Sequence, residues 1–232
     1  MGAFMFYGLD ETQIFLIILS LVISLWAQFM VKSSFRKYSK INNSKGYTGA
    51  QIARDILDKN GLYDVKVEHI RGELTDHFDP RTNVVRLSDS VHSSKSVAAI
   101  GVAAHEVGHA IQYAKLYTPM KIRSAVVPTT NIASYLSMFL FMLGMIMSHK
   151  YLIDIGIVLF CLIIFFQLIT LPVEFNASAR AMKTLQNDNL LIKEELSGAR
   201  KVLTAAALTY VAAFITAILQ LLRLIALANR RR

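Results

Sequence analysis

Apolar residues gather in four long runs along the chain, separated by polar segments. Each run approaches the roughly 20 mostly apolar residues that a membrane-spanning helix requires. The fourth run is richer in small residues, from Ala205 to Ala207 for example, and is expected to pack against protein as well as lipid. The pattern predicts a mainly α-helical integral membrane protein with three or four transmembrane helices, at Ile14 to Val31, Val126 to Met147, Leu152 to Leu171 and Val202 to Leu222.

A polar region between the first two runs predicts a small α+β module. Thr48 is a typical N-cap for a helix from Gly49 to Asn60, and Gly61 is a typical stop. A second helix is expected from about Lys95 to Tyr117, ending near Pro119. Apolar alternation and a turn at 79–83 predict three strands, at Val65 to Ile70, Glu73 to Phe78 and Val84 to Ser88.

These elements divide the chain into five expected parts. Because the second and third runs are joined only by residues 148–151, they form an antiparallel hairpin. The parts are an N-terminal transmembrane anchor (1–31), the module (32–124), the transmembrane hairpin (125–172), a helical segment (173–201) and a C-terminal apolar helix with a basic tail (202–232).

The composition supports the membrane class, since 54% of the residues are hydrophobic and the mean hydropathy is +0.43. The net charge of +9 lies mostly beside the apolar runs, which suits anionic lipid headgroups better than nucleic acid. No nucleic-acid partner is therefore expected. The single cysteine, Cys161, excludes an internal disulfide and a cysteine-based zinc site. The first run follows Asp10 and Glu11 instead of a basic segment, so it predicts a retained anchor and not a signal peptide.

Basic residues next to the runs predict the orientation in the cell membrane. Four of the residues from Lys32 to Lys40 are basic, and Lys121 and Arg123 precede the second run, whereas the hairpin turn has only Lys150. Since cytoplasmic segments are enriched in lysine and arginine, a multi-pass protein with its module at the cytoplasmic face is expected. The tail Arg230–Arg232 conflicts with this if the fourth run crosses fully. Either the tail is a tolerated exception, or the last segment is re-entrant or interfacial.

The segment His105-Glu106-Val107-Gly108-His109 carries the chemistry. Histidines at i and i+4 project from the same side of a helix, so both imidazoles can reach one zinc ion. Glu106 can take a proton from the attacking water and deliver it to the leaving amine. Burying these groups on an apolar helix without a strong partner is costly, which disfavours a purely structural role. One Zn²⁺ held by His105 and His109 is predicted, with Glu106 as catalytic base.

A catalytic zinc site usually has a third protein ligand. Five later residues are candidates: Glu174, Asp188, Glu194, Glu195 and His149. The predicted hairpin crosses the membrane twice between His109 and Glu174, which returns Glu174 to the side of the histidines and leaves His149 at the opposite face. Glu174 also follows Pro172 and is expected at the start of a helix, beside its positive end. The other three acids lie in a stretch typical of a solvated face, so Glu174 is the predicted third ligand.

Two segments together resemble a known family. They are Ala103 to Gln112 and the later Leu171-Pro172-Val173-Glu174-Phe175-Asn176-Ala177-Ser178. They resemble the YugP-type bacterial membrane zinc metallopeptidases, neutral zinc metallopeptidases, and the similarity covers most of the chain, including 74–80 and 208–213. More distantly, the chain is similar to the HtpX and CAAX-prenyl peptidases, which have a Glu-aromatic-x-Ala-Asp pattern at the third ligand. The resemblance implies a gluzincin-like zinc-peptidase core with Glu174 as third ligand.

One position departs from the distant relatives, because Ser178 stands where they have an aspartate that supports the site. A serine can orient a ligand only through its hydroxyl group. Asn176 is a candidate substitute, although on a straight helix it points about 200° away from Glu174. His77 and Arg180 are candidates for stabilising an oxyanion, on charge and neighbourhood alone.

These features predict a membrane-embedded zinc endopeptidase that hydrolyses membrane or membrane-associated polypeptides at the bilayer surface. Its expected partners are a polypeptide substrate and the lipid bilayer. The strand Val84 to Ser88 either offers a free edge to an extended substrate or lies inside the sheet. Two other classes stay open. One is a non-catalytic membrane scaffold or adaptor stabilised by zinc, and the other is a transporter that uses these residues as a metal pathway.

Overall fold

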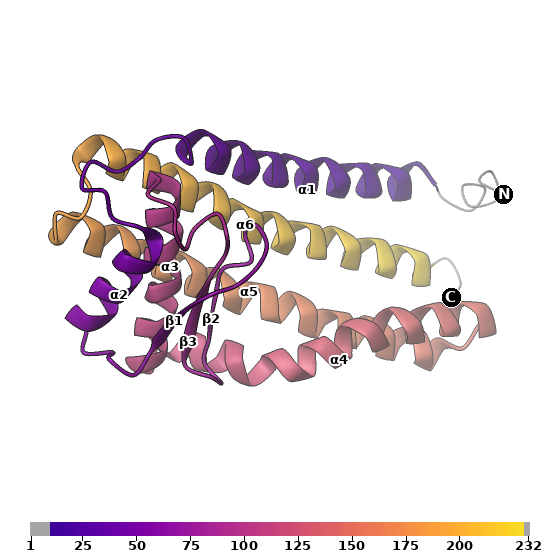
Figure 1. The fold of residues 1–232 in the computed structure, drawn as a ribbon. Coiled ribbons are helices and arrows are strands. Elements are labelled where there is room, and N and C mark those ends of the chain that lie inside the picture. The colour runs from indigo at the N-terminus through magenta and orange to yellow at the C-terminus, as the bar shows by residue number, and fades with distance from the viewer. Residues whose placement is uncertain (1–9, 230–232) are drawn as a thin grey trace.

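The computed structural model describes residues 10–229, so the tail Arg230–Arg232 lies outside the described residues. These residues form six helices and a three-stranded sheet (Figure 1). In chain order the elements are α1 (Glu11–Tyr38), α2 (Gly49–Lys59), β1 (Lys66–His69), β2 (His77–Asp79), β3 (Val84–Leu87), α3 (Val97–Ala114), α4 (Thr118–Met147), α5 (Lys150–Asn187) and α6 (Lys193–Asn229).

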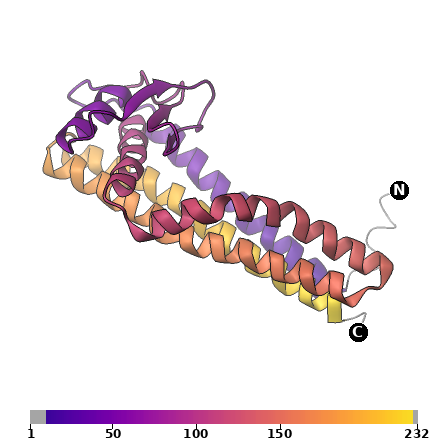
Figure 2. The same ribbon diagram turned by 90° about the horizontal axis from the view of Figure 1, so that it is seen from below.

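Helices α1, α4, α5 and α6 are each long and apolar enough to cross a membrane. They run side by side, and the α4–α5 turn lies at the end of the bundle opposite the sheet and α2 (Figures 1 and 2). Large apolar side chains such as Phe29 (68% exposed) and Ile146 (76%) face outwards, as expected for a lipid-contacting surface. The prediction of a mainly α-helical membrane protein with a small α+β module is confirmed, with four candidate spans.

The fourth apolar run is part of one continuous 37-residue helix, α6. Helix α6 packs along both α1 and α5, and its small residues Ala199, Ala205 and Ala212 are buried. Small side chains allow helices to approach closely, so the expected packing against protein is observed. The unbroken helix favours a full crossing over a re-entrant segment.

Helix α5 runs without interruption through Pro172, which lies in its interior. The expected helix start after Pro172 is therefore wrong, and Glu174 lies far from the N-terminal end of its helix. Membrane helices tolerate proline because neighbouring helices and local adjustments satisfy the freed carbonyl group. Glu174 therefore lies on the same continuous helix as the third apolar run, and this helix packs against α3 of the module.

Both helices of the module begin at a side-chain cap, α2 at the predicted Thr48 and α3 at Ser96, close to the expected start near Lys95. Thr48 and Gln51 form a reciprocal capping box at the start of α2, and the Ser96 side chain accepts a hydrogen bond from the Ala99 N–H at the start of α3. Helix α3 ends at Ala114, slightly before the predicted end. Pro119 does not terminate it but lies in the first turn of α4, where a missing N–H costs nothing.

The sheet has the order β1-β3-β2, with β1 parallel and β2 antiparallel to β3. Strand β3 is therefore central and offers no free edge, so the internal alternative for Val84 to Ser88 is the one observed. Strand β2 is shorter than predicted because Gly72 (φ 113°) and Leu74 (φ 55°) adopt left-handed backbone conformations that interrupt an extended strand. Strand β2 is an edge strand and packs against α3.

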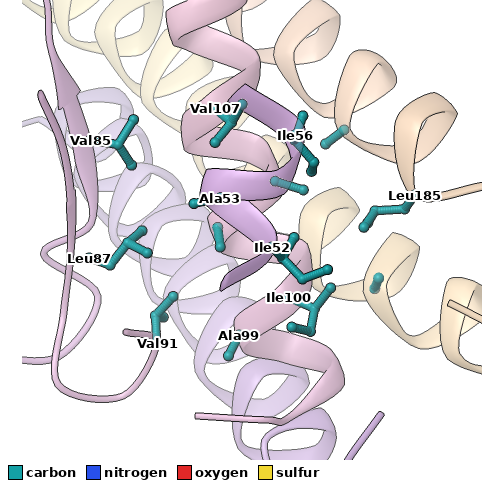
Figure 3. Close-up of a cluster of buried hydrophobic side chains, with 14 of the residues drawn as sticks. Ile52, Ala53, Ile56, Val85, Leu87, Val91, Ala99, Ile100, Val107 and Leu185 are labelled. Carbon is teal, nitrogen blue, oxygen red and sulfur yellow. The ribbon is translucent and has the colours of Figure 1, made fainter. Parts of the chain in front are cut away.

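A single apolar cluster joins the module to the bundle. Ile52 of α2 and Val85 of β3 pack around Ile100 and Val107 of α3, and Leu185 of α5 approaches from the other side (Figure 3). All five side chains are at most 1% exposed. The module therefore shares its core with the end of α5, and this shared core holds α3 in place against α5.

Candidate metal centre

Two histidines of α3 and one glutamate of α5 converge on a single point. The rings of His105 and His109 lie one helical turn apart, with centroids separated by 4.7 Å. Glu174 Oε2 lies 3.3 Å from His105 Nε2 and 3.4 Å from His109 Nε2. Tetrahedral zinc with ligands at about 2.0–2.1 Å separates neighbouring ligand atoms by about 3.3 Å. The three side chains therefore fit the spacing of one zinc ion, and their ligand atoms all lie within 4.8 Å of one another.

Gly108 allows α3 and α5 to approach closely enough to form this cluster. A Cβ atom at this position would lie 2.8 Å from the Ala177 carbonyl oxygen, which is closer than van der Waals contact allows. Because the obstacle is the backbone of a packed helix, it cannot move aside as a flexible side chain would. The glycine between the motif's glutamate and second histidine thus has a packing role.

The substitution Gly108→Ala is expected to push the two helices apart and to weaken zinc binding by at least tenfold, because Glu174 moves away from both histidines. Zinc affinity and the thermal midpoint of unfolding would measure this. Gly101→Ala, on the same helix, is the matched control, since the nearest atom to its new methyl group would be the Ala199 Cβ at 3.3 Å, and the backbone of Ala199 would lie at 3.5 Å or more. Equal zinc affinity in the two variants would contradict the packing role.

A glutamine sets the proton position on one histidine. His109 Nδ1 lies 3.0 Å from Gln112 Oε1, and the Gln112 amide nitrogen donates to the Val173 carbonyl and to Asn176 Oδ1. Because that nitrogen is used as a donor, Oε1 must accept, so His109 Nδ1 carries the proton. The lone pair of Nε2 then points at Glu174, which is the form that binds a metal ion.

A serine hydroxyl occupies the corresponding position on the other histidine. Ser178 Oγ lies 3.1 Å from His105 Nδ1, so serine does reach the ring that an aspartate supports in the distant relatives. The Asn176 Oδ1 atom accepts hydrogen bonds from the Gln112 amide and from Arg180 Nε. Asn176 therefore acts one step further out, by holding Gln112.

The predicted base lies next to the cluster and is shielded from water. Glu106 is 8% exposed. Burial raises the pKa of Glu106 to about 7, while the neighbouring His105 and the backbone N–H of Phe78, which faces the carboxylate, act in the opposite direction. A carboxyl group with a pKa near neutrality can both accept and return a proton.

The two candidate oxyanion groups have hydrogen-bond partners outside the metal-binding cluster. His77 Nδ1 contacts the Thr75 carbonyl oxygen at 2.8 Å, and the Arg180 guanidinium donates to Asn176. Two residues that the sequence reasoning missed contact the cluster: Arg123 Nη1 lies 3.1 Å from Glu174 Oε1, and the Tyr210 hydroxyl faces the same carboxylate. The sequence signals that could have found them were the phenol of Tyr210 within the fourth apolar run and the charge of Arg123 just before the second run.

The other candidate ligands have different partners. Asp188 pairs with Lys59 at 3.4 Å, and Glu194 is exposed. Glu195 is buried, contrary to the expected solvated face, because its carboxylate accepts the backbone N–H groups of Ser44 and Ile192. His149 lies at the start of α5, in the distant hairpin turn. Within the described part of the chain, the metal-binding cluster does not include any of the four.

A helix with two histidines one turn apart, completed by a glutamate from a membrane-spanning helix, is typical of a membrane-embedded zinc metallopeptidase. The comparisons with known proteins agree. The chain belongs to the family described as "Putative neutral zinc metallopeptidase", whose model matches residues 13–229. It is similar to the "Putative membrane protease YugP" of Bacillus subtilis (strain 168), with 52% identity over 212 residues, 91% of this chain and 94% of the relative. No solved structure matches it.

Proposed function

We propose that the protein is a zinc-dependent endopeptidase that cleaves membrane or membrane-associated polypeptides at the bilayer surface. The observation that carries this proposal is the convergence of His105, His109 and Glu174 at zinc-ligand spacing, next to the buried carboxyl group of Glu106. Because Glu174 belongs to a membrane-spanning helix and the histidines to the module, the centre lies where the bundle meets the module.

Each residue of the centre has a separate task in this mechanism. His105, His109 and Glu174 would hold one Zn²⁺, whose chemistry would be to polarise the scissile carbonyl group and to acidify water. Glu106 takes the proton of the attacking water and delivers it to the leaving amine. Gln112 and Ser178 keep the two imidazoles in the correct tautomer and orientation. Of the sheet, edge strand β2 and not β3 is available to pair with an extended substrate beside Glu106.

The basic residues support a cytoplasmic centre. The end of α1, the end of α5 and the start of α6 all lie at the module end of the bundle and carry lysine or arginine, whereas the hairpin turn carries only Lys150. Labelling of a cysteine introduced at Ser93 with a membrane-impermeant thiol reagent tests this. Reaction in intact cells would place the module outside.

Zinc removal tests the proposed function directly. The purified full-length protein, added to membranes from cells that lack it, should generate new polypeptide N-termini, because the centre can then activate water. A zinc chelator should abolish these termini, and stoichiometric Zn²⁺, but not Mg²⁺, should restore them. Unchanged cleavage by protein shown to be free of zinc would refute the proposal. Zinc retention without any cleavage would favour the scaffold.

Tyr210 is the stronger candidate for the oxyanion-stabilising role, because its hydroxyl group reaches the cluster whereas His77 is held by Thr75. Tyr210→Phe is expected to lower kcat by about 10²-fold or more with little change in KM. His77→Asn serves as the comparison and should retain most of the activity. The reverse ranking in steady-state kinetics would return the role to His77.

A further inference from the structure

A groove lies between α5 and α6, apart from the metal-binding cluster. Its volume is about 450 Å³, within the usual range for small-molecule sites. It opens outwards, since Phe175 on its wall is 48% exposed and Lys183, Arg200 and Thr204 are also exposed. We infer that this groove binds one anionic phospholipid.

The groove changes from polar to apolar along its length. Helix α5 ends and α6 begins at the module end, so Lys183 and Arg200 lie at that end of the groove. Phe175 and Leu208 lie at the other end, about 12 Å deeper along the helices at 1.5 Å per residue. This arrangement fits a headgroup at the surface and an acyl chain pointing into the bilayer.

The charge of the groove selects the headgroup. Lys183 and Arg200 make no ion pair or hydrogen bond within residues 10–229, and no acidic side chain is among the described residues that line the groove. Two unpaired cations beside an apolar channel at a membrane surface attract an anionic lipid phosphate more strongly than a zwitterionic headgroup. The complementary occupant is therefore an anionic lipid such as phosphatidylglycerol.

The groove is separate from the substrate-binding side of the metal centre. Ser178, which lines the groove, contacts His105 through Nδ1, whereas Nε2 on the opposite side of the ring faces Glu174. The serine and the imidazole therefore stand between the groove and the place where peptide chemistry would occur. A lipid in the groove leaves the centre free.

Binding of phosphatidylglycerol tests the inference. Full-length protein carrying Glu106→Gln is titrated with phosphatidylglycerol against a phosphatidylcholine background, and bound lipid is counted by native mass spectrometry. Lys183→Gln with Arg200→Gln should lower the preference for phosphatidylglycerol about tenfold or more. The control pair Lys193→Gln with Lys201→Gln removes the same charge from α6 outside the groove and should leave the preference unchanged.

A second variant separates occupancy of the groove from general surface attraction. Thr204→Trp keeps every charge but fills the cavity, and it should abolish retention of the lipid. Three results would each overturn the inference. They are equal phosphatidylglycerol binding in wild type and Lys183→Gln/Arg200→Gln, equal losses of binding in the two charge pairs, and full lipid retention in Thr204→Trp. If Thr204→Trp still retained the lipid but, in an otherwise wild-type protein, raised the KM for peptide, the groove would be assigned to the substrate. Lipid binding is measured on the inactive variant, so failure of the proposed peptidase activity does not affect this result.

Discussion

Replacement of Glu106 by glutamine is expected to lower kcat for peptide hydrolysis by about 10²–10⁴-fold, the usual contribution of a positioned general base. Glutamine has nearly the same shape but cannot accept the proton of the attacking water. Zinc should remain bound at the wild-type stoichiometry, because the ligand atoms belong to the other three residues of the centre. The measurement is steady-state cleavage combined with metal analysis of the same purified sample.

The Glu106→Gln variant should also fold normally. Burial raises the pKa of Glu106 because it disfavours the charged form, and a neutral amide avoids that cost. Glu194→Gln, a change at an exposed carboxylate, is the control and should cleave as wild type does. A zinc-loaded Glu106→Gln protein that cleaves at the wild-type rate would exclude Glu106 as the base.

The second large effect is expected at the third ligand. Glu174→Ala should weaken zinc binding by more than about 100-fold, beyond the 10- to 100-fold that loss of a supporting group costs. Two causes add up: a ligand oxygen is removed, and Arg123 loses its carboxylate partner. Isothermal titration of metal-free protein in detergent with Zn²⁺ would measure the change.

Three further variants make the Glu174 test specific. Ser178→Ala removes only the hydroxyl group that contacts His105, so it should lower the zinc affinity less than Glu174→Ala does. Asp188→Asn and Glu194→Gln should bind zinc as tightly as wild type, because neither side chain approaches the histidines. Equal zinc affinity in Glu174→Ala, Asp188→Asn and Glu194→Gln would refute the ligand assignment.

The elements of the fold were predictable wherever the signal was local. The apolar runs approach the length needed to cross a bilayer, so the four candidate spans could be located. Thr48 identified the start of α2 because capping depends on neighbouring residues. Pro172 misled, since proline usually ends a helix in water but is tolerated in a long membrane helix.

The sequence by itself was enough to predict the candidate zinc ligands and to predict that they share one side of the membrane. The i, i+4 spacing places His105 and His109 on one face of any helix, and two crossings of about equal length return Glu174 to the same side. These conclusions depend only on helix geometry and on bilayer thickness, which hold for any packing of the helices.

Only the tertiary structure decided how the helices are rotated against one another. Each step along a helix turns a side chain by about 100°, so no local pattern reveals that Gln112 reaches His109 or that Arg123 reaches Glu174. The pairing order of the sheet, with β3 in the centre, likewise depends on contacts distant in sequence. The close approach at Gly108 and the groove between α5 and α6 arise where two packed helix surfaces meet, which is a property of the pair and not of either sequence segment.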